Sequence, residues 1–180
     1  MRLLLIRHGM TEGNMRRAYI GSTDEPLSQK GREAVAALHY PEADAVFSSP
    51  MARAKETAEL IYPDKTAVIV EALRECSFGE FEGKTYDELR ERPDYRAWID
   101  AGGNGAAPGG EDSAAFRKRS ADAVLKIAQT AKCGSTVAVI CHGGTIMAYM
   151  HRRFGGGFYD WQVENAHGYM IDGEGRYEPI

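Results

Sequence analysis

Residues 3–9 read LLLIRHG, four apolar residues that run directly into an arginine, a histidine and a glycine. Residues 136–144 read TVAVICHGG and repeat this form. Short apolar, β-branched runs of this kind are typical of buried strands. Because ligands collect outside the carboxyl ends of the strands in an open α/β sheet, the two segments predict that His8 and His142 lie at one edge of a sheet.

Three further apolar runs, at residues 45–47, 67–70 and 169–171, predict additional strands. The segments between the runs have helical spacing. We expect helices near residues 28–38 and 54–61, and a longer one from Asp112 or Ser113 to a stop at Gly134. Strands that alternate with helices of this length predict an α/β fold, with a mostly parallel central sheet between two helical layers.

The chain has 180 residues, which fits a single domain over residues 1–180. Residues 73–110 break the regular alternation, and we interpret them as an insertion over one end of the sheet. Short helices are expected near residues 86–90 and 95–99, followed by a mobile glycine-rich loop, AGGNGAAPGG. The alternative is a plain, solvent-exposed connection.

Composition excludes several classes of partner. The net charge of −4 and the isoelectric point near 5.8 do not favour a nucleic acid. No apolar run approaches the roughly 20 residues that span a bilayer, so no membrane partner is expected. The three cysteines, Cys76, Cys133 and Cys141, form no CxxC pair and do not predict a zinc site. Their odd number favours a reducing compartment, and hence a cytoplasmic protein. The oligomeric state stays open.

The residues at the two strand ends indicate an anion site. Arg7 carries a permanent charge on a fork of donors, and the glycines beside His8 and His142 let backbone N–H groups approach an anion. One His-Gly pair alone could simply form a turn. A metal site is the other alternative, but neither histidine lies in an HxH or HExxH pattern. GEFEGKT, residues 79–85, has one residue too few between its glycines for a nucleotide-binding P-loop.

Five segments, taken in order, resemble the signatures of the histidine phosphatase superfamily, which has the phosphoglycerate mutase-like fold. They are RHGMTEGN (7–14), SSPMARAKETA (48–58), LRECSFGEFEG (73–83), PGGE (108–111) and CHGGTI (141–146). The resemblance extends to about residue 170. It implies catalysis without a metal or a cofactor.

The resemblance also implies roles for single residues. His8 would be the nucleophile that becomes phosphorylated, and Glu75 the acid/base. Four residues would bind the phosphoryl group, and all but the asparagine would also belong to the catalytic set: Arg7, Asn14, Arg53 and His142.

General chemistry agrees with these roles. Phosphoryl transfer depends on positioning and on neutralising the charge of the phosphoryl oxygens, so two guanidinium groups and a histidine N–H can serve where other enzymes use magnesium. Cationic surroundings should keep His8 neutral, with one ring nitrogen donating to a backbone carbonyl. Glu75 must hold a proton near neutral pH, which either burial or the carboxylates of Glu80 and Glu82 would favour.

The resemblance implies a metal-independent phosphomonoesterase that acts through a phosphohistidine. The mutase branch is generally longer, and FGEFEG and PGGE are most similar to alpha-ribazole phosphatases and broad-specificity phosphatases. The expected substrate is a small phosphorylated metabolite, with alpha-ribazole phosphate as a candidate. Alternatives are a cofactor-dependent phosphoglycerate mutase, a phosphoprotein phosphatase and a non-catalytic phosphate-binding module. A closed pocket lined by aromatic residues such as Tyr86, Tyr95 and Trp98 would favour a small molecule.

Overall fold

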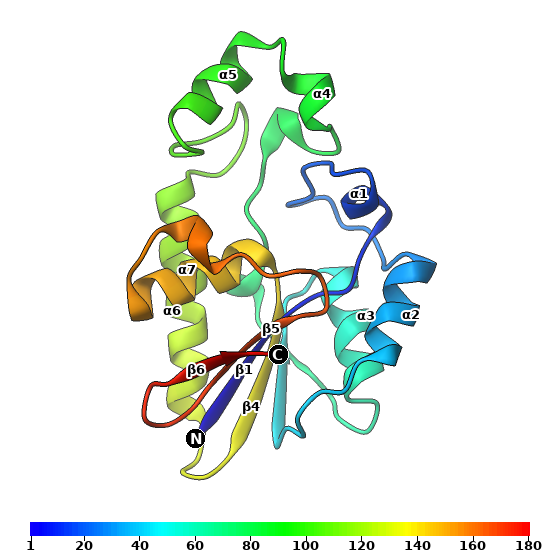
Figure 1. The fold of residues 1–180 in the computed structure, drawn as a ribbon, viewed down its shortest axis with the longest axis vertical. Helices are drawn as coiled ribbons and strands as arrows, with labels where there is room; N and C mark the ends of the chain where they lie inside the picture. Colours follow the sequence, from blue (N-terminus) through cyan, green and yellow to red (C-terminus); the bar gives the residue numbers. More distant parts are fainter.

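The computed structural model describes residues 1–180 and contains one six-stranded sheet in the order β3-β2-β4-β1-β5-β6 (Figure 1). Strands β3, β2, β4 and β1 run parallel, whereas β5 pairs antiparallel with β1 and β6 antiparallel with β5. The prediction of a mostly parallel sheet is confirmed. The strands are β1 (Arg2–Arg7), β2 (Ala45–Ser48), β3 (Val68–Ile69), β4 (Thr136–Cys141), β5 (Gly168–Ile171) and β6 (Tyr177–Pro179).

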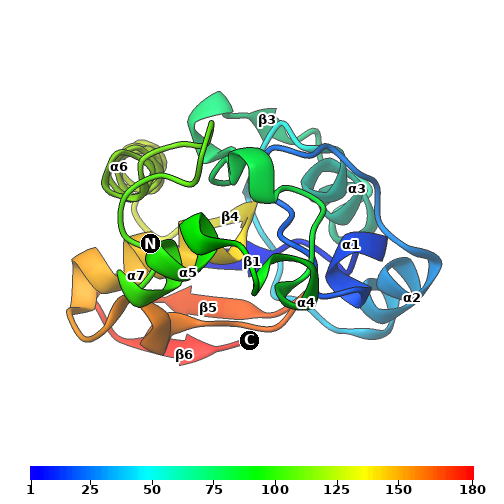
Figure 2. The ribbon, with the colours of Figure 1, turned by 90° about the horizontal axis from the view of Figure 1, so that it is seen from above.

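Helices cover both faces of the sheet. Helices α2 and α3 lie on one face and α6 and α7 on the other, which gives the expected three layers (Figure 2). None of the helices is both long enough and apolar enough to cross a membrane. The helices are α1 (Glu12–Met15), α2 (Gln29–Ala37), α3 (Ala52–Ile61), α4 (Tyr86–Leu89), α5 (Pro93–Asp100), α6 (Ser113–Thr130) and α7 (Gly143–Phe154), and the 3-10 turns are η1 (Glu71–Leu73), η2 (Gly79–Phe81) and η3 (Phe158–Trp161).

Side-chain caps explain where two of the helices begin. The Ser28 hydroxyl accepts a hydrogen bond from the Gly31 N–H at the start of α2. The Asp112 carboxylate accepts from two backbone N–H groups at the start of α6. Helix α6 ends at Thr130, earlier than the predicted stop, and Gly134 supplies the positive φ of the turn that follows.

Strand β1 is the centre of the core. Leu3 and Leu5 belong to the apolar cluster shared with α6 and α7, whereas Leu4 and Ile6 belong to the cluster shared with α3. The neighbouring strand β4 is buried along its whole length. This alternation of successive side chains between two covered faces produces the continuous apolar runs of the sequence.

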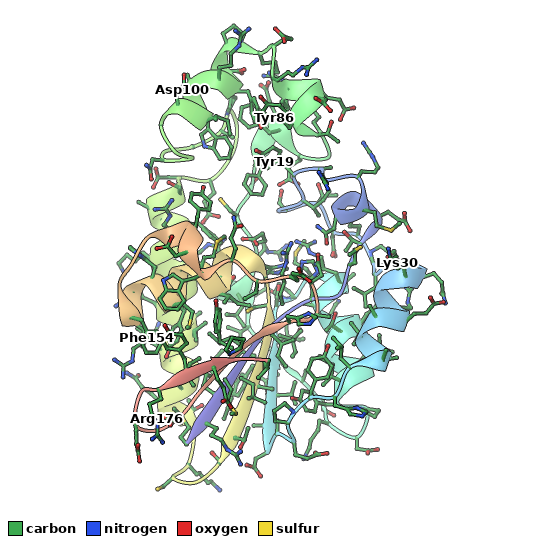
Figure 3. The ribbon with its side chains drawn as sticks, viewed as in Figure 1. Tyr19, Lys30, Tyr86, Asp100, Phe154 and Arg176 are labelled. Atoms are coloured by element: carbon green, nitrogen blue, oxygen red, sulfur yellow. The ribbon has the colours of Figure 1, made fainter.

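Residues 73–110, called the cap below, lie mainly beyond the carboxyl ends of the parallel strands (Figure 1). The cap has a small core of its own, formed by Phe81, Leu89, Tyr95 and Ala107. Ala107 shows that part of the glycine-rich segment is packed; its mobility stays a prediction. Figure 3 shows Tyr19 beneath the cap, where its hydroxyl lies 2.9 Å from that of Tyr95. This hydrogen bond ties the cap to the segment that follows β1.

Strand β6 was not predicted from the sequence, and strand β3 is shorter than predicted. Strand β6 is short and exposed, so it carries no buried apolar pattern. Strand β3 covers only Val68–Ile69 of the expected residues 67–70, and both of its side chains are exposed at the sheet edge. Apolar periodicity detects burial, so it is least informative where a strand lies at an edge.

We expect Leu5→Ala to lower the free energy of unfolding by about 2–5 kcal/mol, because it opens a cavity at a fully buried position of β1. Ile69→Ala on the exposed edge strand is the control and should cost less than about 1 kcal/mol. Urea denaturation of both variants measures the difference. Equal losses would contradict the assignment of β1 to the centre of the core.

Candidate active site

His8 and His142 meet at the carboxyl ends of β1 and β4. The parallel pairing places Arg7 opposite Cys141, so the next residue of each chain segment is a histidine. The centroids of the two imidazole rings lie 5.2 Å apart, with 64° between the ring planes. The structure therefore brings together the two strand-end histidines that the sequence singled out.

The His8 ring is buried and is held in one tautomer. Its Nδ1 donates to the Gly9 carbonyl oxygen at 2.7 Å, and its Nε2 accepts from the Arg53 Nε at 3.2 Å. Burial is the main reason that the pKa of His8 lies well below its ordinary value, and the charges of Arg53 and Arg7 lower it further. His8 is thus a neutral imidazole whose Nε2 carries the free electron pair.

Arg53 lies behind His8 and has 0% of its surface exposed. Two of its N–H groups donate to the carbonyl oxygens of Gly21 and Thr23, each at 2.8 Å. Burial lowers the pKa of Arg53, and nearby carboxylates, with Glu75 first, act in the opposite direction. The guanidinium keeps its charge because backbone oxygens and these carboxylates replace the lost water.

Glu82 binds residues 21–23, the segment whose carbonyl oxygens bind Arg53. Its carboxylate accepts hydrogen bonds from the backbone N–H groups of Gly21, Ser22 and Thr23, at 2.8–3.2 Å. The same short segment therefore directs N–H groups toward Glu82 and two of its carbonyls toward Arg53. Burial favours a higher pKa for Glu82, but the donated hydrogen bonds outweigh it and lower the pKa below its usual value.

Glu75 lines the same cavity as His8. Its two oxygens accept from the N–H groups of Cys76 at 2.9 Å and Gly144 at 3.1 Å. Burial raises the pKa of Glu75 above its ordinary value, although these hydrogen bonds and the two arginines oppose the shift. The sequence suggests two causes for a raised pKa of Glu75, and burial is the one that contributes. The neighbouring carboxylates do not, because Glu82 binds the backbone N–H groups of residues 21–23 and Glu80 pairs with Arg92 at 2.7 Å.

Two buried donors beside His8 have no hydrogen-bond partner: Arg7 Nε and His142 Nδ1. The Ser49 hydroxyl lies 2.7 Å from His142 Nε2 and has no other acceptor, so it donates to that nitrogen and leaves the proton of the neutral ring on Nδ1. Buried donors are almost always paired in folded proteins. Their position next to His8 fits an anion that both would contact.

Asn14 lines the same site, and Asn165 sets its orientation. The Asn14 Oδ1 accepts from the Thr11 N–H at 3.3 Å and from the Asn165 Nδ2 at 3.1 Å, which leaves the Asn14 amide nitrogen free. Asn165 also donates to the His8 carbonyl oxygen at 3.1 Å. Asn165 lies outside every segment that the sequence analysis singled out, so no sequence signal pointed to it. Ser49, by contrast, lies in the quoted segment SSPMARAKETA.

A cavity of about 650 Å³ lies beside His8 and is lined in part by the cap, which contributes Glu75 and Trp98. Four predicted site residues line it, namely Arg7, His8, Asn14 and Glu75, whereas Arg53 and His142 lie deeper. Of the three aromatic residues expected to line a pocket, only Trp98 does so; Tyr95 fills the core of the cap and Tyr86 is exposed. No group of three or more metal-binding side chains is present.

Comparison with known proteins identifies the family that the chain resembles. A model of the histidine phosphatase superfamily (branch 1) matches residues 3–177. The chain is 29% identical to the adenosylcobalamin/alpha-ribazole phosphatase of Salmonella typhimurium, over 84% of this chain and 79% of that protein. It is 33% identical to a Gloeobacter violaceus protein named 2,3-bisphosphoglycerate-dependent phosphoglycerate mutase 2, over 82% and 73%. The crystal structure of the alpha-ribazole phosphatase from Shigella flexneri superimposes with a TM-score of 0.83 at 28% identity, over 96% of this chain and 90% of that one.

The buried histidines predict a loss of stability in acid. Below pH 6.5, the ordinary pKa of histidine, the unfolded chain binds a proton at His8 that the folded chain does not bind. The free energy of unfolding should therefore fall as the pH drops, by up to about 1.4 kcal/mol per pH unit for each such histidine. The raised pKa of Glu75 acts in the opposite direction, so the informative quantity is the difference between variants.

His8→Gln should make this slope shallower, as measured by urea denaturation at a series of pH values. His39→Gln provides the control, because His39 is exposed and distant from the site in the sequence. If His8→Gln left the slope at the wild-type value, His8 would not be neutral in the folded chain.

Proposed function

We propose that this chain, which belongs to the histidine phosphatase superfamily (branch 1), hydrolyses a small phosphomonoester through a phosphohistidine on His8 without a metal ion. One observation carries the proposal: the buried His8 ring lies beside two buried nitrogen atoms, Arg7 Nε and His142 Nδ1, that have no hydrogen-bond partner in the protein. A dianionic phosphoryl group supplies the acceptors that these donors lack.

In the first step, His8 Nε2 attacks the phosphorus atom. The hydrogen bond from Nδ1 to the Gly9 carbonyl oxygen fixes the tautomer and stabilises the positive charge that develops on the ring. The 3.2 Å contact between Nε2 and Arg53 must lengthen as phosphorus approaches. The Arg53 Nε–H then becomes available to a phosphoryl oxygen.

The same step breaks the bond between phosphorus and the ester oxygen. Protonated Glu75 gives its proton to the departing alkoxide, which leaves as the alcohol. In the second step, the Glu75 carboxylate removes a proton from water, and the resulting hydroxide attacks the phosphohistidine. The P–N bond breaks, inorganic phosphate leaves and His8 is neutral again. The raised pKa of Glu75 supports its role as the acid of the first step.

Fixed cations take the place that magnesium has in many other phosphoryl-transfer enzymes. Arg7 and Arg53 would neutralise the phosphoryl oxygens, with His142 Nδ1 and the free Asn14 amide nitrogen as further donors. Arg53 is already immobilised by the Gly21 and Thr23 carbonyls, so little reorganisation is needed when the charge develops.

The cavity favours a small organic phosphate as the substrate. Its walls include the rings of Phe78, Trp98, Phe116 and Phe158, and its volume of about 650 Å³ suits a metabolite. The names of the Salmonella typhimurium and Shigella flexneri relatives make alpha-ribazole phosphate a candidate. A phosphoprotein phosphatase would need a more open surface around His8, and a non-catalytic module would have no need for a carboxyl group whose pKa is raised.

A phosphoglycerate mutase is the second candidate, because a protein with that name is 33% identical to this chain. A mutase would retain the phosphoryl group on His8 and return it to a second substrate hydroxyl. The two candidates share the first chemical step and differ in whether water reaches the phosphohistidine.

His8→Ala should reduce phosphate release by at least roughly a thousandfold, because the nucleophile is lost. The measurement is inorganic phosphate released from a panel that includes alpha-ribazole phosphate and 3-phosphoglycerate, with excess EDTA present. His39→Ala is the control and should keep the wild-type rate. Near-normal release by His8→Ala, or its loss in EDTA, would overturn the proposed mechanism. Interconversion of 2- and 3-phosphoglycerate without phosphate release, once bisphosphoglycerate primes the enzyme, would favour the mutase.

Glu75→Gln should slow the first turnover of alkyl phosphates by roughly a hundredfold or more, because the alkoxide then leaves without a proton. Aryl phosphates such as p-nitrophenyl phosphate should lose far less in that turnover, since their leaving groups need little protonation. Rapid-quench measurement of the first turnover separates this step from phosphohistidine hydrolysis. Glu80→Gln, at an exposed carboxylate, is the control. Equal losses on both substrate types would remove Glu75 from the acid role.

A further inference from the structure

We propose that Arg117 binds a second negatively charged group of the substrate, a carboxylate or a further phosphate. The inference rests on the proposed function, in which the first phosphoryl group lies against His8. Arg117 belongs to α6, and it lines the same cavity as His8 and Glu75. The class of substrate would thus be a phosphomonoester with an anionic group elsewhere on its alcohol.

Arg117 is a cation without a partner in the protein. The structure contains no ion pair or hydrogen bond that involves its guanidinium group. Arg119, two residues later on the same helix, is fully engaged: it binds both oxygens of Glu111 at 2.7 Å and three backbone carbonyls. Arg117 therefore retains all of its donors for a ligand.

An aromatic ring holds the Arg117 guanidinium in the cavity wall. Its central carbon lies 4.0 Å from the centroid of the Phe158 ring, which comes from η3. Stacking of this kind stabilises the cation through the face of the guanidinium and leaves the N–H groups at its edge free. Phe158 also lines the cavity, so the stacked pair forms a fixed, charged part of its wall.

The charges around the cavity leave Arg117 unbalanced. Arg7 and Arg117 are the permanent cations that line it, and Glu75 and Glu111 are its acids. Both oxygens of Glu111 already bind Arg119. Glu75 serves as a proton donor rather than as a fixed anion in the proposed first step. The charge of Arg7 is balanced by the transferred phosphoryl group. The positive charge of Arg117 therefore remains for another part of the substrate.

Phe116 is an aromatic residue of the cavity wall that lies beside Glu75. Phe116 approaches the Gly144 Cα from the same side as Glu75: a Cβ built on Gly144 would lie 2.5 Å from Glu75 Oε1 and 2.8 Å from Phe116 Cζ. The cavity wall therefore includes the Phe116 ring beside Glu75 and also the stacked pair of Arg117 and Phe158. This combination suits a substrate that carries a phosphate, an apolar part and a second anion.

The test uses phosphonates, which bind without being hydrolysed. We would measure the affinity of the wild-type chain for ω-phosphonoalkanoates of increasing length and for the matched ω-phosphonoalkanamides, which lack the carboxylate charge, by titration calorimetry. The matched α,ω-bisphosphonates form the third series. They distinguish a second phosphate from a carboxylate. Arg117→Gln is the test variant. Arg153→Gln is the control, because Arg153 also stacks on a ring, that of Phe154, without an ion pair and outside the cavity.

For at least one length of the alkyl linker, the wild-type protein should bind the phosphonoalkanoate or the bisphosphonate about tenfold or more tightly than the phosphonoalkanamide of the same length. A hydrogen bond to a charged group contributes a difference of this size. Arg117→Gln should remove this preference, and Arg153→Gln should keep it. Absence of the preference at every length, or its survival in Arg117→Gln, would overturn the proposal. Failure of the proposed function has a different signature, because His8-dependent phosphate release would be missing while the preference for the anionic phosphonate persisted.

Discussion

The parallel pairing of β1 with β4 is the constraint on which the site depends. Both strands are buried on two faces, so a slip in register by one residue would exchange the side chains of two different cores. The same register that fills these cores places Arg7 opposite Cys141 and delivers His8 and His142 to one edge. The packing of the two apolar cores therefore determines where the His8 and His142 rings lie, more than the contact between the rings does.

Charge is buried at this edge, and the backbone supports it. A buried guanidinium without partners would be strongly unfavourable, and Arg53 avoids this through carbonyl oxygens of a segment whose N–H groups are held by Glu82. Glu82 thus acts on His8 through two intermediates, the segment and Arg53. The arrangement keeps a positive charge close to a histidine that stays neutral, which is the combination that attack on a phosphoryl group requires.

The rest of the cavity comes from elements outside the sheet. The cap contributes Trp98, helix α6 contributes Phe116 and Arg117, and η3 contributes Phe158. None of these side chains belongs to the two apolar clusters in which β1 and β4 pack. The strand-end residues and the cavity walls are in this sense supplied by separate parts of the fold.

The sequence by itself determined the layered α/β architecture and the meeting of His8 with His142, because apolar periodicity and strand-end position are local properties. It also indicated Glu75 and Arg53 through their resemblance to known segments. Only the tertiary structure decided which partner each charged group takes: Glu82 binds the segment at Gly21 rather than influencing Glu75, and Arg117 stays without an acid. It also sent Tyr95 into the core of the cap and Trp98 to the cavity. These outcomes depend on contacts between residues that are far apart in the chain. Several residues could serve equally well as the partner of a charged group, and spacing in the sequence does not show which of them the packing of the fold will bring close.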